Sequence, residues 1–225
     1  MVEHLTCNEV VLGSIPRGGS MIISHTNKFI FIKSEKTGGS SVETALEPSL
    51  IFSDVYHKNG HEIPAQILQR YGSKIFNHYF KFSIVRNPFD KMVSHYFWQK
   101  YLQPEKYNSF HDFVKEFYDN KIISNWKYFS INNNIVVDRI LKYEDLQKDL
   151  HSISSDISID IDISNIFEKS GYRPVNVPYQ EYYSDTIKEM VEAIKAKGVP
   201  AAVSLSAGAF LCNHVFYVAQ SKFAG

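Results

Sequence analysis

Residues 29–46, with the sequence FIFIKSEKTGGSSVETAL, decide the fold of this chain. Residues 29–32 are apolar and rich in strand formers, so they predict a buried strand. The polar residues that follow predict a loop with two adjacent glycines. Ser40 or Ser41 then favours the start of a helix, which Pro48 ends. A strand that enters a helix through a glycine loop presents backbone N–H groups to an anion.

Strand and helix patterns alternate along the rest of the chain. We expect strands at 80–85 and within 135–143, a weak strand or loop at 152–162, and another strand at 199–205. Helices are expected over 61–71, from Pro88, and over 110–118, 144–150, 182–197 and 207–219. The order predicts an α/β fold with a central, mostly parallel sheet, helices on both faces and a P-loop-like strand–loop–helix. The loop is not the nucleoside-triphosphatase P-loop, because Lys36 precedes the glycine pair.

Composition excludes several classes of protein. The chain has 225 residues, 24 basic and 24 acidic side chains, 44% hydrophobic residues and two cysteines. Such a chain is neither disordered nor built on disulfides, and its neutrality argues against a surface that coats nucleic acid. No apolar run has the length of a signal-peptide core or a membrane span, so we expect no membrane span and a cytoplasmic, reducing setting. No acidic pattern typical of a metal site is seen.

The composition changes near residue 190. Residues 1–190 contain only Ala45 and Ala65, whereas residues 191–225 contain eight alanines and only four charged side chains. We interpret residues 1–190 as one domain and residues 191–225 as a strand–helix segment of different origin, packed on that domain or appended to it.

Two separate motifs predict phosphate sites. The first is the loop and helix start, in which backbone groups, hydroxyls and one ammonium would bind an anion; its residues are Lys36, Thr37, Gly38, Gly39, Ser40 and Ser41. The second is a strand-end Arg86 followed two helical turns later by Ser94, and a guanidinium offers paired donors to phosphate. The alternative for Arg86 is a structural ion pair with Asp90.

These motifs, residues 31–41 and 82–94, resemble the sulfotransferase superfamily, especially the branch that sulfates carbohydrates. The resemblance extends over residues 25–190. It implies that the chain binds 3′-phosphoadenosine 5′-phosphosulfate (PAPS), with Lys36 to Ser41 on the 5′-phosphosulfate and with Arg86 and Ser94 on the 3′-phosphate. It also implies an enzyme that transfers the sulfuryl group to a hydroxyl of a small or oligosaccharide acceptor, without a metal.

In such a reaction Lys36 would neutralise the leaving nucleotide, and a base would take the acceptor proton. The resemblance implies His61 as that base, with His57 second and with Glu62 and Glu43 as further candidates. Tyr56, Trp98, Tyr101 and Trp126 are candidates for stacking on sugar rings, although aromatic residues at such spacing are commonly found in the core.

The C-terminal segment has a different resemblance. Residues 198–204 and 206–217 resemble pyroglutamyl peptidase I, and the similarity covers residues 187–218. It implies that Cys212 is the nucleophile of a Cys–His–acid triad. The family's histidine follows its cysteine by about twenty residues or more, whereas 13 residues follow Cys212, and His214 lies on a different helix face.

Several functions besides sulfuryl transfer therefore remain open. The first is a pyroglutamyl-peptidase-like cysteine peptidase fragment fused to a non-catalytic nucleotide-binding body. The phosphate sites would also suit a nucleotide-binding module or small-molecule kinase. They would equally suit a non-catalytic interaction protein that keeps these sites without turnover.

Overall fold

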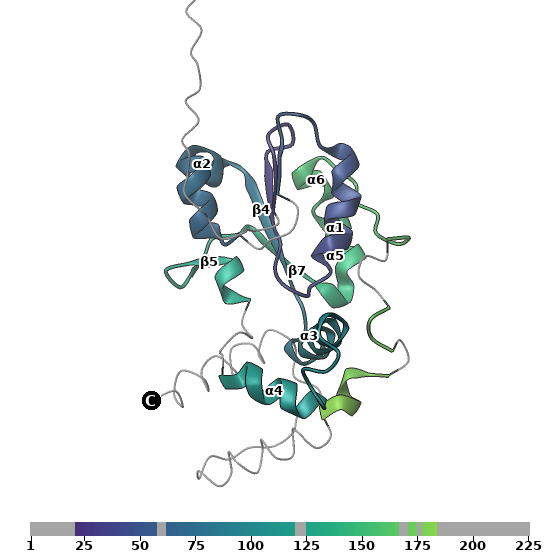
Figure 1. Cartoon of the computed structure of the whole chain (residues 1–225). Helices are drawn as coiled ribbons and strands as arrows, with labels where there is room; N and C mark the ends of the chain where they lie inside the picture. The colour runs from purple at the N-terminus through teal and green to yellow at the C-terminus, as the bar shows by residue number, and fades with distance from the viewer. Residues whose placement is uncertain (1–20, 58–61, 120–124, 167–170, 175–176, 184–225) are drawn as a thin grey trace, which may run out of the picture.

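A computed structural model describes residues 21–57, 62–119, 125–166, 171–174 and 177–183 of the chain. Its centre is a five-stranded sheet in the order β3-β1-β2-β4-β7 (Figure 1). The strands are β1 (Met21–Ser24), β2 (Phe29–Ile32), β3 (Val55–His57), β4 (Phe80–Val85) and β7 (Arg139–Lys142). A separate two-stranded sheet pairs β5 (Ser130–Ile131) with β6 (Asn134–Ile135).

The sheet is mixed in direction. Strand β4 pairs parallel with both β2 and β7, whereas β1 pairs antiparallel with β2 and β3. The expected α/β fold with a central sheet is confirmed, but the sheet, expected to be mostly parallel, is mixed, because the antiparallel strands β1 and β3 were not foreseen. Because β2 and β4 are parallel neighbours, their carboxyl ends lie together at one edge, where the segments after both strands meet.

Helices cover both faces of the sheet, as expected. Helix α2 lies on one side, and α1, α5 and α6 lie on the other (Figure 1). The α-helices are α1 (Gly39–Leu46), α2 (Pro64–His78), α3 (Pro88–Leu102), α4 (Phe110–Asp119), α5 (Leu146–Ser152) and α6 (Ser154–Ile157). The 3-10 helices are η1 (Glu47–Ser49), η2 (Trp126–Tyr128), η3 (Tyr143–Asp145) and η4 (Tyr179–Tyr183).

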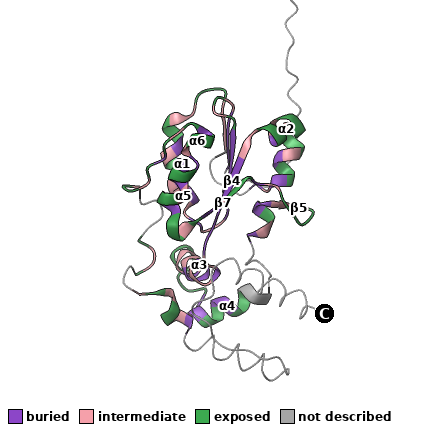
Figure 2. Cartoon of the chain, turned by 180° about the vertical axis from the view of Figure 1, so that it is seen from behind, coloured by how far each residue is buried: buried purple, intermediate pink, exposed green. Residues whose placement is uncertain are grey.

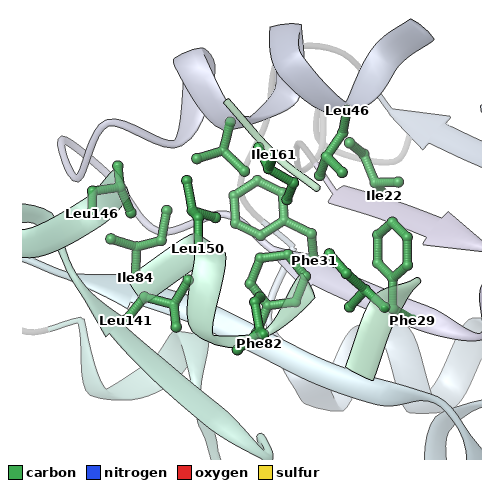
Figure 3. Close-up of a cluster of buried hydrophobic side chains, with 13 residues drawn as sticks. Ile22, Phe29, Phe31, Leu46, Phe82, Ile84, Leu141, Leu146, Leu150 and Ile161 are labelled. Carbon is green, nitrogen blue, oxygen red and sulfur yellow. The ribbon is translucent and has the colours of Figure 1, made fainter. Parts of the chain in front are cut away.

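The alternation of β2 explains the two-sided core. Phe29 and Phe31 point to the face covered by α1 and α5, where the Phe31 and Phe82 rings stack 5.0 Å apart (Figure 3). Ile30 and Ile32 point to the other face, under α2. All four β2 side chains are fully buried. Burial on both faces is why this strand reads as a continuous apolar run.

A third apolar cluster lies beyond the end of β4, between α3, α4 and η4. Figure 2 shows buried positions on the inner faces of these elements and exposed positions outside. The cluster matters for the site because α3 begins directly after the loop that follows β4.

Two expected elements are different in the structure. The helix expected over 61–71 is α2, which begins at Pro64 and ends at His78; proline suits a first helical turn because it has no N–H to leave unpaired. Residues 152–162, expected as a weak strand or loop, contain the short helix α6, whose Ile157 is fully buried in the core. Of the helix expected over 182–197, the structure describes only Tyr182 and Tyr183, which belong to the 3-10 helix η4. The elements expected at 199–205 and 207–219 lie outside the described residues. Within the described ranges, no helix is long and apolar enough to cross a membrane.

Candidate functional site

The loop between β2 and α1 depends on Gly38. This residue precedes α1 with φ +77°, in the left-handed region that favours glycine. A Cβ atom placed on it would come within 2.9 Å of the Tyr143 ring. The backbone conformation and the neighbouring ring therefore both require glycine here.

The first turn of α1 presents backbone donors at the loop. No acidic side chain lies in this turn, and no side chain caps it. Gly39 is buried, and a Cβ atom there would lie 2.7 Å from Cγ of Lys33. Ser40 and Ser41 are half-buried on the same turn. This arrangement is suited to an anion, because the partial positive charge at the start of a helix favours negative groups.

The Thr37 side chain forms hydrogen bonds within the β2–α1 loop. Its side chain is buried, and its hydroxyl donates to the Ser34 carbonyl over 3.1 Å. The hydroxyls of Thr37 and Ser34 lie 2.9 Å apart, and the Ser34 hydroxyl also bonds to the carbonyl of Ile84 in β4. These bonds fasten the loop to the end of β4.

Arg86 brings the two sequence motifs together. It follows β4, and its Nη1 donates to the Lys36 carbonyl over 3.1 Å. Its Nε and Nη2 each lie 2.7 Å from Oδ2 of Asp90, and its guanidinium lies 4.0 Å from the centre of the Tyr143 ring. The structural ion pair with Asp90 is thus present. Arg86 holds the loop in place with N–H groups that a phosphate ligand would otherwise engage.

A second arginine shares the same carboxylate. Arg173 forms an ion pair with Oδ1 of Asp90 and donates to the Val177 carbonyl over 2.9 Å. One carboxylate therefore faces two guanidiniums, which leaves local positive charge beside the loop. No sequence pattern indicates Arg173, because it lies 83 residues from Asp90 in an irregular segment.

Helix α3 contains Ser94 and, through Trp98, also contacts Lys36 of the loop. Lys36 has φ +60° and is half-buried, with its ammonium 4.9 Å from the Trp98 ring centre. Ser94 lies in α3 and is partly exposed. The structure thus brings Lys36 close to α3.

A buried group of titratable side chains lies behind the loop, and sequence patterns alone do not reveal it. Lys91 is 5% exposed and donates to Asn125 over 2.5 Å. Burial lowers the pKa of Lys91 to about 8, since the charged ammonium loses its hydration. Tyr128 donates to Glu35 over 2.6 Å, and burial raises the Tyr128 pKa. Glu35 lies in the β2–α1 loop, but its partners come from distant elements that no spacing could indicate.

His95 belongs to the same surroundings. Burial, with the charges of Lys36 and Lys91 nearby, lowers its pKa to about 4. The imidazole is therefore neutral at pH 7, and Gln99 lies 3.1 Å from its Nε2. Burial and the nearby cations therefore make His95 a weak base, and no sequence motif singles out this residue.

The remaining candidate acids and bases are placed differently. Glu43 is buried in an ion pair with Lys33 at 2.5 Å, and Glu62 is buried in an ion pair with Arg70. Both are structural partners in this arrangement. His61 and Cys212 lie outside the described residues, and His57 ends β3. Among the described residues, no group of three or more side chains is placed to hold a metal ion.

Comparison with known proteins points to the C-terminal part of the chain. The family model for pyroglutamyl peptidase matches residues 146–224. A pyrrolidone-carboxylate peptidase of Staphylococcus haemolyticus is 46% identical over 67 residues, which are 27% of this chain and 32% of that protein. One from Bacillus cereus is 42% identical over 67 residues, with shares of 27% and 31%. One from Bacillus cytotoxicus is 36% identical over 74 residues, with shares of 30% and 34%. No solved structure matches the chain.

These matches correct the main functional expectation. They relate the chain to pyroglutamyl peptidases and give no support to a sulfotransferase. The expected PAPS-dependent enzyme, the PAPS cofactor and the partners, a nucleotide donor and a saccharide acceptor, are therefore wrong. The peptidase reading is the better-supported function. The chain spans about a third of the length of the curated relatives it matches.

Proposed function

We propose that this chain carries a pyroglutamyl-peptidase-type nucleophile, Cys212, which acts on peptides with an N-terminal pyroglutamyl residue. The observation that carries the proposal is the match of residues 146–224 to that family, together with 46% identity to a pyrrolidone-carboxylate peptidase. Cys212 lies inside the matched range, in the stretch that resembles the family's nucleophile segment. A cytoplasmic setting suits this proposal, because a reducing compartment keeps a thiol available.

The chemistry follows from the thiol. The Cys212 thiolate would attack the carbonyl carbon of the pyroglutamyl residue, and a thioester would form as the peptide amine leaves with a proton. Water would then hydrolyse the thioester and regenerate the thiol. The reaction consumes one water and needs no oxidant or cofactor. Activation requires a base that accepts the thiol proton.

The test uses the full chain and a fluorogenic amide of pyroglutamate. Because the sequence has two cysteines, Cys7→Ser is a matched control for Cys212→Ser. We expect hydrolysis by the wild type and by Cys7→Ser, and a loss of about a thousandfold or more in Cys212→Ser. Equal rates in the two variants, or no hydrolysis by the wild type, would contradict the proposal.

We also propose that the body, by which we mean the described part of residues 1–190, binds an oxyanion at the P-loop-like start of α1. The residues Lys36 to Ser41 would bind it, with support from Arg86 and Ser94. The specific observation in its favour is the bond from Arg86 Nη1 to the Lys36 carbonyl, which joins the two motifs at one edge of the sheet. A turn without acidic side chains and two guanidiniums on one carboxylate add positive potential there.

Inorganic phosphate is the probe for this second proposal. Phosphate should raise the unfolding temperature of the wild type, because a ligand that binds only the folded state stabilises it. We expect Lys36→Ala to lose most of this shift and Lys142→Ala, an exposed lysine of β7, to retain it. An equal shift in both variants would place the anion elsewhere.

We also propose that a boundary near residue 190 divides the chain into two structural units. The alanine-rich composition of 191–225 supports it, whereas the family match begins at residue 146, where α5 enters the body core through Leu146 and Leu150. Limited proteolysis with mass spectrometry tests it, since cleavage near 190 that leaves a stable body would support two units.

A further inference from the structure

A cavity of about 840 Å³ lies between the C-terminal half of α3 and the segment that precedes η4. Its lining residues are Phe97, Lys100, Tyr101, Gly171, Tyr172, Arg173 and Pro174. This volume is within the range of small-molecule sites. No residue of the β2–α1 loop lines the cavity, although the Lys36 ammonium of that loop lies 4.9 Å from the centre of the Trp98 ring beside it.

One wall of the cavity is aromatic. The Tyr101 and Tyr172 rings lie 4.5 Å apart between centres, and Trp98 packs against both, at 6.0 Å and 5.1 Å. Tyr101 is 61% exposed despite this packing. A supported ring that keeps an open face can stack on a flat ligand ring at a small cost in conformational entropy.

The polar groups at the cavity are cationic. Lys100 is exposed, and among the described residues no carboxylate lies within ion-pair distance of its ammonium, which donates to the Tyr96 hydroxyl over 3.4 Å. Arg173 shares the Asp90 carboxylate with Arg86. The lining includes no acidic side chain, and because Asp90 pairs with Arg173 from outside the lining, the positive charge of the cavity comes chiefly from Lys100.

We propose that this cavity binds a small anion that carries a flat ring. The ring stacks on Tyr101 and Tyr172, and its carboxylate or phosphate group pairs with Lys100 and Arg173. Aromatic walls alone would accept any apolar ring, and cations alone would accept any anion. The two together favour a molecule that has both features. The site goes beyond the proposed function, because it requires neither Cys212 nor the loop.

The experiment measures calorimetric binding of phenyl phosphate to the full chain and to its Lys36→Ala variant, in buffer without inorganic phosphate, which would compete for Lys100 and Arg173. Lys36→Ala removes the ammonium of the α1 loop, so binding that this variant retains does not depend on an oxyanion site at the loop. Benzyl alcohol supplies the ring without the anion. We expect phenyl phosphate to bind and benzyl alcohol to bind at least about tenfold more weakly.

Two variants address the two features. Tyr101→Leu keeps apolar volume but removes the stacking face, and Lys100→Ala removes the cation; each should weaken phenyl phosphate about threefold to tenfold. The matched controls are Phe52→Leu, a fully exposed aromatic elsewhere, and Lys115→Ala, an exposed lysine of α4. All four positions are exposed, so the variants should fold, which circular dichroism checks.

The outcomes separate the explanations. Weakening in the Tyr101 and Lys100 variants with unchanged controls supports the cavity. The absence of phenyl phosphate binding overturns the proposal. Equal binding of phenyl phosphate in wild type and Tyr101→Leu also overturns it, because the ring would then not use this wall. Equal binding of phenyl phosphate by the wild type and by Lys36→Ala assigns the binding to the cavity, whether or not the loop binds phosphate.

Discussion

The body and the C-terminal segment differ in composition and in the chemical groups that they contribute. The body buries charged side chains around one loop: Lys33 with Glu43, Arg86 with Asp90, and Lys91 with Asn125. Residues 191–225 have only four charged side chains and contribute one thiol, Cys212. One region therefore contributes buried charged side chains, and the other contributes the thiol that we propose as a nucleophile.

The difference shows why local motifs misdirected the functional expectation. A glycine loop at a helix start, a strand-end arginine and a following serine are requirements for holding an oxyanion, and any chemistry that holds one can use them. They specify the site's charge but not its reaction. The C-terminal segment has few charged side chains, and what it contributes to the proposed function is its match to a family model, which suggests one reaction.

The largest effect should come from breaking the buried ion pair of the body. Lys33 and Glu43 have side-chain exposures of 9% and 6%, so Glu43→Leu leaves an ammonium buried without its carboxylate. We expect urea unfolding to show a loss of about 3–5 kcal/mol, and Lys33→Met/Glu43→Leu to recover most of it. The control Glu116→Leu breaks an exposed pair with Lys106 and should leave the unfolding midpoint unchanged.

Glu43→Leu also tests whether the body and the C-terminal segment unfold together, with the labelling rate of the Cys212 thiol as the measurement. If the C-terminal segment acts independently of the body, the rate of Cys212 labelling in Cys7→Ser protein should not change with Glu43→Leu. Labelling that accelerates in step with body unfolding would instead show that the two regions form one cooperative unit.

Sequence reasoning was accurate where a local pattern decides the structure. The apolar runs in residues 29–32 and 80–85, the glycine pair and Pro88 each constrain their own segment, and the strands and helices there are confirmed. It failed where distant residues decide. The pairing of β1 with β2, the sharing of Asp90 by Arg173 and the partners of Glu35 depend on tertiary contacts that no local pattern encodes.

The next effect in size is a dependence of folding stability on pH that arises from Lys91 in the body. Burial lowers the pKa of Lys91 to about 8 from its ordinary value of 10.5, so between these values the unfolded chain binds more protons than the folded chain. Folding stability should therefore rise with pH in this window, by about 2 kcal/mol between about pH 8 and 9.5 from this group.

Urea unfolding at several pH values measures this slope as the difference between wild type and Lys91→Met. Removal of the ammonium leaves Asn125 without its donor, and the loss of this hydrogen bond does not create a slope. Lys115→Met, at an exposed position of α4, is the control and should keep the wild-type slope. A wild-type slope in Lys91→Met would show that another group is responsible.

The smallest expected effect comes from a change in the shape of the β2–α1 loop that leaves its charge unchanged. Gly38→Ala changes no charge, but it places a Cβ atom at φ +77° and within 2.9 Å of the Tyr143 ring. The strained backbone should reduce the free energy of unfolding by about 1–2 kcal/mol, which urea unfolding measures.

Gly72→Ala is a control for phosphate binding, because Gly72 also has a positive φ, +80°, lies outside the loop and has nothing within 4 Å of its added Cβ. Its ψ of 163° lies in a region that only glycine commonly adopts, so its loss of stability should be at least as large as that of Gly38→Ala. Phosphate-induced stabilisation should decrease only in Gly38→Ala, because only that glycine shapes the start of α1. Equal behaviour of the two variants would mean that the loop's close packing contributes nothing to anion binding and that charge alone sets the body apart.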